Sequence, residues 1–295
     1  FEAHSNRRYN TADYLNVDPL LGTNEEFEVL CREAAKYGIG IVLDGVFSHT
    51  GSDSRYFNRE GRYGEGGAYR DPNSPYRSWY DFDPKYKGGY RSWWGFETLP
   101  EVNEENPSYV EFITGEGGVI DTWLRRGAAG FRLDVADELP DDFIEKIRAA
   151  VKRVSPEKFL LGEVWEDATT KYGFGQRRTY LLGKGLDSVM NYPFKNAVLD
   201  FVKGKPAEQA MGEILSICEH YPAPAMDTAL NFLSTHDTER ALTVIADEPA
   251  NGRGREWQSG RCVTGEAYEE GMLRLRMAYA IIYTLPGVPC LYYGD

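Results

Sequence analysis

The sequence predicts an α/β protein, and within that class a (β/α)8 barrel, on the basis of three features. Short apolar runs typical of buried strands alternate with amphipathic helical segments, which is the pattern of a parallel sheet. Nearly every apolar run ends in a carboxylic acid or a histidine, and the carboxyl ends of barrel strands meet at one mouth. The alternative is a doubly wound sheet, but the sequence contains no Gly-rich phosphate loop after the first such run. We therefore favour the barrel.

Six strands are predicted, beginning with the apolar run at residues 39–47. The helix before this run has marked limits, because Thr23 and Glu26 form a capping box at its start and Gly38 ends it. The five later strands are expected at residues 128–135, 159–165, 186–194, 229–235 and 288–293.

Two further helices are clear from the spacing of their apolar residues. In residues 141–154, side chains such as Phe143, Ile147 and Val151 recur at helical spacing and form one apolar stripe. Residues 272–285 are expected to form a more apolar helix directly before the last strand.

One stretch, residues 51–106, interrupts the alternation of strands and helices. It contains 13 of the 40 aromatic residues and 8 glycines, lacks helical periodicity and is too long for an ordinary barrel connection. We expect an excursion subdomain over the barrel mouth. The alternative is a large, partly ordered surface insertion, which the many Trp and Tyr residues disfavour. The chain would then divide into barrel residues 1–50, the excursion at 51–106, and barrel residues 107–295.

Composition argues against two classes of partner. The formal net charge of −13 disfavours nucleic acid, because a phosphate backbone demands a basic surface. No apolar run approaches the roughly 18 residues of a membrane-spanning helix, so we expect no membrane partner.

The cysteines bear on the cellular location of the protein, and the chain ends bear on whether the sequence is part of a longer protein. The four cysteines are widely scattered, which favours free thiols over disulfides or metal ligands. Free thiols and an acidic charge together favour a cytoplasmic over a secreted location. The chain starts at Phe1 and stops directly after a predicted strand, so we expect it to be part of a longer protein.

Two acids at the ends of neighbouring predicted strands form the candidate catalytic pair. Arg132 lies two residues before Asp134, so both side chains point to the same side of the strand. An Arg beside an Asp lowers the pKa of the Asp and keeps it ionised, as a nucleophile requires. Glu163 ends the next strand among apolar neighbours, and such surroundings raise the pKa of a Glu, as a general acid requires. Two carboxyl groups with pKa values pushed apart are typical of glycosidic bond cleavage.

These residues also fit two roles other than catalysis. Arg132 and Asp134 alone could form a structural salt bridge. The acids and histidines could also bind Mg²⁺ or Mn²⁺, although the fixed cation of Arg132 would repel a divalent metal. The plausible ligands of such a metal site are Asp44, His49, Asp134, Glu163, His236 and Asp237. The combination of residues favours catalysis, and we predict no metal site.

Short motifs in the sequence resemble the four signature regions of the α-amylase family of glycoside hydrolases. They read DGVFSH from Asp44, GFRLD from Gly130, GEVW from Gly162 and FLSTHD from Phe232. The segments SNRRYNTADY, DPLLGT, LPEVN and GVPCLYYGD also resemble that family, so the resemblance covers essentially the whole chain. It is closest to the group of neopullulanases, cyclomaltodextrinases and maltogenic amylases.

The resemblance implies a catalytic role for three matching acids. Asp134 would be the nucleophile that forms a covalent glucosyl ester. Glu163 would protonate the leaving oxygen and later deprotonate the incoming water. Asp237 would hold sugar hydroxyls and favour the distorted, cationic transition state.

The same resemblance assigns supporting and substrate-binding roles to six further residues. Arg132 would hold Asp134 ionised, and Asp44 would support the inner cluster of acids. Two histidines would bind hydroxyls of the cleaved sugar, one aromatic ring would stack under that sugar, and another would line the acceptor side. The two histidines are His49 and His236. The ring under the sugar is that of Tyr9, and the ring on the acceptor side is that of Trp165.

The resemblance also implies which substrates are cleaved, whether a metal is needed and which strands of the barrel are present. The expected substrates are α-1,4-linked glucans, with α-1,6 bonds as a further option, in maltooligosaccharides, cyclodextrins, pullulan or starch. The alternative is a non-catalytic amylase-like module that binds carbohydrate or protein, but none of the three acids is lost. Many family members have an Asn at the position of Ser48, and that Asn ligates a structural calcium. Ser lacks the amide carbonyl of Asn, so a structural calcium is doubtful here, and we expect no required cofactor. The chain would hold barrel strands three to eight, with the first two strands missing.

Overall fold

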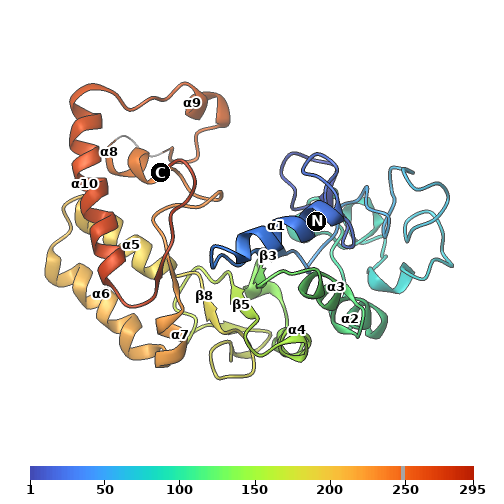
Figure 1. Ribbon diagram of the computed structural model, residues 1–295. Coiled ribbons are helices and arrows are strands. Elements are labelled where there is room, and N and C mark those ends of the chain that lie inside the picture. The colour runs from blue at the N-terminus through green and yellow to red at the C-terminus, as the bar shows by residue number, and fades with distance from the viewer. Residues whose placement is uncertain (247–249) are drawn as a thin grey trace. The chain divides into compact units, whose positions relative to one another are not determined.

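The computed structural model describes residues 1–246 and 250–295 and divides into two compact units, each with its own buried core (Figure 1). No predicted site residue lies among residues 247–249, which fall outside the described part of the chain. Unit 1 comprises Phe1–Glu163, Gly173–Gly175 and Lys184–Leu186. Unit 2 comprises Val164–Tyr172, Gln176–Gly183 and Asp187–Asp295.

Unit 1 contains three parallel strands, β3 (Val42–Gly45), β4 (Gly130–Leu133) and β5 (Phe159–Gly162). They confirm the first three predicted strands, although each is shorter than the apolar run that predicted it. The strand β4 lies between the other two and is buried along its whole length. Gly130, Phe131 and Leu133 are apolar, as a strand covered on both faces requires, and Arg132 is its one charged residue.

The register of these strands determines which polar side chains come together. Asp44 of β3 pairs with Arg132 of β4, and the chain continues from β4 into Asp134. Glu163 follows β5 in the same way. Because the strands are parallel, the two acids leave the sheet at the same edge.

The helices of unit 1 form largely as predicted. They are α1 (Asn24–Ala35), α2 (Pro107–Thr114), α3 (Val119–Arg125) and α4 (Asp141–Val154). The α4 helix has the predicted bounds, and its apolar stripe is buried. At the start of α1, the Thr23 hydroxyl accepts from the Glu26 amide while the Glu26 carboxylate accepts from the Thr23 amide, which confirms the capping box. This helix ends before Gly38, whose φ of 71° closes the turn that follows.

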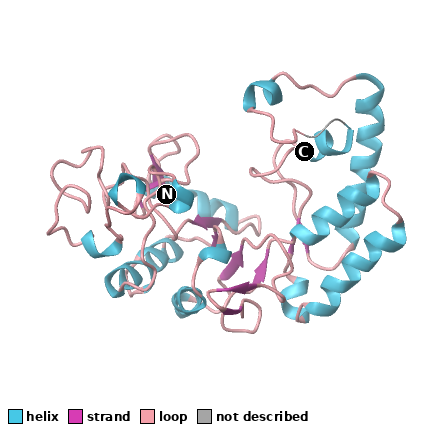
Figure 2. Ribbon diagram, turned by 180° about the vertical axis from the view of Figure 1, so that it is seen from behind, coloured by secondary structure: helices cyan, strands magenta, loops and turns pink. Residues whose placement is uncertain are grey.

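Residues 51–106 are mostly loop, as Figure 2 shows, and contain only short 3₁₀ helices. These are η1 (Arg77–Trp79), η2 (Lys87–Gly89) and η3 (Trp93–Gly95). The loop is nevertheless packed around its own buried aromatic side chains, whose rings contact one another. They include Tyr56, Phe57, Trp79, Tyr80 and Tyr90. This packing supports a folded excursion, whose status as a separate subdomain stays a prediction.

A short antiparallel pair at the start of the chain was not predicted from the sequence. It joins β1 (Glu2–Ala3) to β2 (Thr11–Asp13), and strands of this length leave no periodic signal. The connection between the two strands carries Tyr9, one of the predicted site residues.

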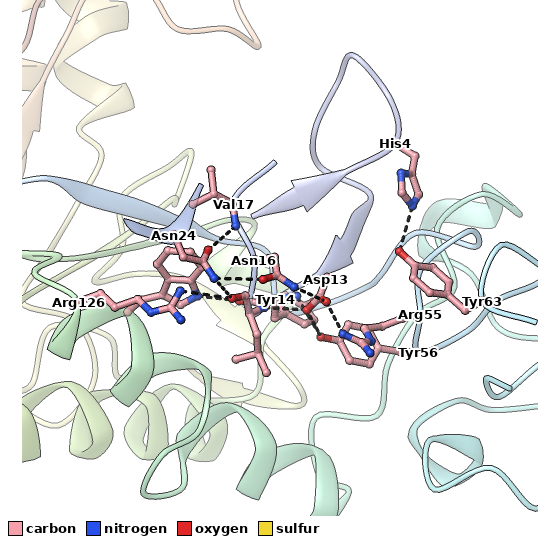
Figure 3. Close-up of polar contacts among 12 residues, drawn as sticks. His4, Asp13, Tyr14, Asn16, Val17, Asn24, Arg55, Tyr56, Tyr63 and Arg126 are labelled. Carbon is pink, nitrogen blue, oxygen red and sulfur yellow. Dashed lines mark hydrogen bonds and ion pairs between the residues drawn. The ribbon is translucent and has the colours of Figure 1, made fainter. Parts of the chain in front are cut away.

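Asp13, at the end of β2, ties this segment to residues 51–106 (Figure 3). Its buried carboxylate accepts hydrogen bonds from the Leu15 amide at 2.9 Å and from Asn16 Nδ2 at 2.9 Å. It also accepts from Arg55 Nη1 at 2.5 Å and from the Tyr56 hydroxyl at 3.2 Å. A buried carboxylate with this many donors is satisfied, so we assign Asp13 a structural role.

Unit 2 carries the later helices and short strands. The helices are α5 (Tyr192–Val202), α6 (Ala207–His220), α7 (Ala223–Asp227), α8 (Ala241–Ala246), α9 (Arg255–Ser259) and α10 (Gly265–Thr284). The α10 helix contains most of the predicted helix at 272–285 and begins earlier. The two-residue strands β6 (Tyr172–Gly173) and β7 (Gln176–Arg177) were not predicted.

The last three predicted strands are present in a shortened form. They are β8 (Ser188–Val189), β9 (Leu230–Asn231) and β10 (Val288–Pro289), and β9 pairs with β10 in parallel. The prediction of a strand over 186–194 was wrong at its end, because Asn191 caps α5 by accepting from the Phe194 amide. The parallel α/β class is confirmed, while closure into a barrel and the two missing strands stay predictions.

Among the helices in the described part of the chain, none combines the length and the apolar character needed to cross a bilayer. The four cysteines are free thiols.

We predict that Gly130→Ala disrupts the pairing of β4 with β5. A Cβ at this position would lie 2.1 Å from the carbonyl oxygen of Phe159, and this backbone atom cannot move without breaking the strand pair. We expect the free energy of unfolding, measured by urea denaturation, to fall by about 3 kcal/mol or more.

The matched control is Gly212→Ala in α6, where a Cβ would meet open space. Because Ala has the higher helix propensity, this variant should gain up to about 1 kcal/mol. Equal stabilities of the two variants would contradict the packing described for β4.

Candidate active site

Three acids and one arginine gather where the parallel strands of unit 1 end. Asp44 lies in β3, Arg132 in β4, and Asp134 and Glu163 directly follow β4 and β5. The side chains of Arg132, Asp134 and Glu163 are at least nine-tenths buried, whereas that of Asp44 is 38% exposed. The structure therefore brings these four predicted site residues together.

The guanidinium of Arg132 contacts all three carboxylates. Its Nη1 donates to Asp44 Oδ1 at 2.7 Å and Oδ2 at 2.9 Å, and to Asp134 Oδ1 at 2.8 Å. Its Nη2 forms an ion pair with Glu163 Oε2 at 2.8 Å. Burial lowers the pKa of Arg132, but the three carboxylates outweigh burial and raise it above its usual value. A permanent single positive charge is thus shared among three acids.

Asp134 behaves differently from the prediction. Burial raises the pKa of Asp134 to about 8; Arg132 opposes this shift, while Asp44 and Glu163 add to it. The expectation that Arg132 keeps Asp134 ionised was therefore wrong for the substrate-free protein. The physical reason is that Arg132 is divided among three carboxylates, so its charge does not offset the removal of Asp134 from water. A pKa of about 8 favours the protonated form of Asp134 at neutral pH.

The surroundings of Glu163 also differ from the prediction. We expected an apolar pocket, but Oε2 of Glu163 accepts from the amide of Val135 at 2.9 Å and lies in the ion pair with Arg132. Both contacts come from β4 and the turn that follows it. They depend on the register between neighbouring strands, and the flanking residues of Glu163 in the sequence carry no sign of them.

Val135 contributes a backbone contact to the candidate site that the sequence analysis missed. Its φ of 40° and ψ of 51° are left-handed, which is rare for a β-branched side chain and costs of order 1–3 kcal/mol. This conformation turns the Val135 amide toward Glu163. Strain of this kind persists only where the surrounding structure imposes it, and here it links the two candidate catalytic acids.

Tyr9 and His49 form a second layer of polar contacts next to Asp44. The Tyr9 hydroxyl donates to Asp44 Oδ2 at 2.7 Å, and burial together with Asp44 raises the pKa of Tyr9. Nε2 of His49 lies 3.0 Å from the Tyr9 carbonyl oxygen, and Nδ1 lies 2.9 Å from the Ser48 hydroxyl. Burial lowers the pKa of His49 to about 4, so the ring is neutral at pH 7.

Ser48, which stands where many family members have a calcium-ligating Asn, has a hydrogen-bond partner in this layer. Its side chain is buried and its hydroxyl is paired with the imidazole of His49. Within residues 1–246 and 250–295, no three His, Cys, Asp or Glu side chains are arranged to hold a metal ion. Our expectation that no cofactor is required stays a prediction.

The remaining predicted site residues, Trp165, His236 and Asp237, belong to unit 2. Within that unit, Nε2 of His236 lies 3.1 Å from Asp237 Oδ2, and both side chains are exposed by more than a third. The ring of Trp165 stacks on Tyr192 with centroids 4.2 Å apart and planes 15° apart. Their placement beside Asp134 stays a prediction.

Comparison with known proteins identifies the family. Residues 1–295 match the family described as alpha amylase, catalytic domain. The chain belongs to the alpha-amylase family. This family assignment confirms the resemblance in the sequence and places the cluster around Arg132 in the catalytic domain of a glycosidase family.

Curated relatives in the alpha-amylase family carry the names of α-glucan enzymes. The amylopullulanase of Thermoanaerobacter thermohydrosulfuricus is 37% identical over 333 residues, covering 100% of this chain and 21% of that protein. Neopullulanase 2 of Thermoactinomyces vulgaris is 32% identical over 304 residues, covering 100% of this chain and 45% of that protein. The chain thus spans less than half the length of these relatives.

Solved structures of the alpha-amylase family match over the whole chain. The type III pullulan hydrolase from Thermococcus kodakarensis matches with a TM-score of 0.82 at 28% identity, covering 100% of this chain and 48% of that chain. The cyclic α-maltosyl-(1→6)-maltose hydrolase from Arthrobacter globiformis, bound to that sugar, matches with a TM-score of 0.81 at 28% identity. The coverage is 100% of this chain and 59% of that one.

We predict that Asp134→Asn stabilises the fold increasingly as the pH rises. The pKa of Asp134 is about 8 in the folded protein and about 4 when unfolded, so the native state binds more protons between these values. The stability contributed by the protonated Asp134 is present below pH 4 and is lost as the pH rises toward 8. The Asn variant has no proton to lose there. Its advantage over the wild type in free energy of unfolding should grow by roughly 2–4 kcal/mol between pH 5 and 8.

The control for this experiment is Asp227→Asn, which changes an exposed acid at the end of α7. The difference in free energy of unfolding between this variant and the wild type should stay constant over the same pH range. A constant difference for Asp134→Asn as well would show that Asp134 is already ionised in the folded protein at pH 5.

Proposed function

We propose that this chain is the catalytic part of a retaining glycoside hydrolase that cleaves α-1,4 bonds, and also α-1,6 bonds, in α-glucans. The observation that carries the proposal is the guanidinium of Arg132, which joins the carboxylates of Asp134 and Glu163 at the ends of neighbouring strands. A shared guanidinium holds two carboxyl groups close together. Retaining glycosidases need such a pair about 5–5.5 Å apart.

The first step of the proposed reaction forms a covalent ester. A carboxylate oxygen of Asp134 attacks the anomeric carbon of the sugar while the glycosidic C–O bond breaks. Glu163 transfers its proton to the leaving oxygen, which departs as the hydroxyl of the acceptor sugar. Negative charge on Asp134 is consumed as positive charge develops on the sugar. Throughout this step, the hydrogen bond from Arg132 holds the carboxylate of Asp134 in place.

The second step releases the sugar. Glu163 removes a proton from a water molecule, whose oxygen attacks the same anomeric carbon and breaks the ester with Asp134. Two inversions at one carbon retain the α configuration. A sugar hydroxyl in place of water would give transglycosylation.

The proton held by the free cluster fits this cycle. Three carboxylates and one guanidinium carry an excess of negative charge in a buried site, and one bound proton reduces it. In the productive state this proton lies on Glu163, and Asp134 is the ionised partner of Arg132. The neutral imidazole of His49 gives its one N–H to the Tyr9 carbonyl, so a hydrogen bond from His49 to a sugar hydroxyl requires this contact to be exchanged when substrate binds.

Unit 2 supplies the other proposed contacts with substrate. Asp237 would hold hydroxyls of the distorted sugar, with His236 beside it. Trp165 presents a partly exposed indole face supported by Tyr192, which suits an acceptor sugar. The six strands would correspond to strands three to eight of the family barrel, and residues 51–106 to its excursion.

The substrate is proposed from the names of the relatives together with these aromatic faces. Amylopullulanase and neopullulanase are names of related proteins, and one related structure holds a cyclic maltosyl-maltose. Maltooligosaccharides, cyclodextrins, pullulan and starch are therefore the substrates to assay.

We predict that Glu163→Gln lowers turnover of maltooligosaccharides, cyclodextrin and pullulan by at least about 10²–10⁴-fold, since Gln can neither give nor take the proton. Released reducing ends measure the rate in the protein that contains this chain, and NMR of the first product gives the anomer. The matched control is Glu157→Gln, an exposed acid before β5, which should retain wild-type activity. Full activity of Glu163→Gln, or a β-anomeric first product, would overturn the mechanism. A wild type that binds α-glucans without cleaving them would instead identify a non-catalytic module.

A further inference from the structure

The loop at residues 92–100 in unit 1 presents exposed aromatic side chains on a rigid base. Ser92 pairs with Pro100, and the Trp93 amide donates to the Leu99 carbonyl at 2.8 Å, so the loop is closed at its root. At its tip, Trp94 is 76% exposed and Phe96 is 56% exposed. Within residues 51–106, Trp79 and Tyr90 are buried and Tyr63 and Tyr69 are 36% and 41% exposed, so Trp94 and Phe96 are the most exposed aromatic side chains of this segment.

Trp94 is held in a conformation that its own burial does not explain. Its φ is 51°, a left-handed value that costs free energy for any residue with a side chain. An indole exposed to this degree gains little from the hydrophobic effect, and water could satisfy its N–H. A strained and exposed aromatic residue is a candidate for ligand contact.

One carboxylate fixes the orientation of both indoles in this loop. Nε1 of Trp94 donates to Glu138 Oε1 at 2.7 Å, and Nε1 of Trp93 donates to Glu138 Oε2. Glu138 lies in η4 (Ala136–Glu138), the turn that follows Asp134 and Val135. The turn after the candidate nucleophile therefore sets the direction of the loop.

The same loop continues toward the candidate active site. The ring centroids of Trp93 and His49 are 5.3 Å apart, with an angle of 36° between the planes. The backbone of Glu101, which follows the loop, forms an antiparallel β-bridge with that of His49. The Thr50 amide donates to the Pro100 carbonyl at 3.1 Å. A series of neighbouring rings thus runs from the buried imidazole of His49 through Trp93 to the exposed indole of Trp94.

We propose that Trp94, flanked by Phe96, stacks on a glucosyl unit of the α-glucan beyond the unit attacked by Asp134, and that Glu138 is the positioning residue for this contact. The proposal rests on the proposed function. A pyranose ring has an apolar face of C–H groups that packs on an indole, while its hydroxyls remain at the rim in water. Such a contact favours longer substrates, because only they reach the loop.

The test compares a long with a short substrate. For maltohexaose and maltotriose, kcat and KM are measured separately in the full protein, and maltohexaose binding is measured by calorimetry in the Glu163→Gln background. Trp94→Ala should lower the kcat/KM ratio of maltohexaose to maltotriose by about tenfold, mainly through the KM for maltohexaose. Glu138→Ala should lower the same ratio, and the double variant should be no worse than Trp94→Ala alone. Glu138→Gln keeps one acceptor oxygen and should restore part of the effect.

The matched control is Tyr37→Ala, which removes an 81% exposed aromatic side chain at the end of α1 and should leave the ratio unchanged. An unchanged ratio and unchanged maltohexaose binding in Trp94→Ala would overturn the proposal, as would equal losses on both substrates. A wild type without any hydrolysis refutes the proposed function alone, because the calorimetric comparison of Trp94→Ala with its parent still decides whether the loop binds the glucan.

Discussion

In unit 1, the arrangement of the candidate catalytic acids depends on the guanidinium of Arg132. Removing the carboxylates of Asp134 and Glu163 from water costs several kcal/mol each unless a cation compensates them. A guanidinium has a planar set of donors and reaches all three acids at once, which the single ammonium group of a lysine does not. It therefore joins side chains from β3, β4 and β5 into one cluster. Burial raises the pKa of Asp134 to about 8 because the divided charge of Arg132 does not offset it, and acid–base catalysis needs a bound proton.

The backbone brings the partners of Arg132 to it. The register of β3 with β4 sets Asp44 beside Arg132, and parallel pairing of β4 with β5 sends Asp134 and Glu163 out of the same edge. The strained turn at Val135 then adds a direct hydrogen bond from one catalytic strand end to the other acid. Further along this turn, Glu138 orients the aromatic loop, so the connection after β4 links the chemistry to the proposed recognition of longer glucans.

The elements that could be predicted from the sequence are those with a strong local signal. The strands of unit 1 lie within mainly apolar runs, α4 has an apolar stripe at helical spacing, and Thr23 with Glu26 marks a helix start. The same reasoning extended one strand through Asn191, because a helix cap inside an apolar run is a weaker signal than the run itself. The motifs contain Asp44, Arg132, Asp134 and Glu163, which the structure brings into contact.

What could not be predicted depends on contacts between segments far apart in the sequence. The approach of Arg132 to Glu163 follows from strand register, and the raised pKa of Asp134 follows from its burial, which the divided charge of Arg132 does not offset. The contacts of Trp93 and Trp94 with Glu138 likewise join distant segments. The central claim is tested most directly by ¹³C NMR titration of the carboxyl carbons of Asp44, Asp134 and Glu163 in the substrate-free protein. The account predicts that one proton stays in this cluster until about pH 8, with Asp134 among the carbons that report its loss. Complete ionisation of all three acids below pH 5 would contradict it.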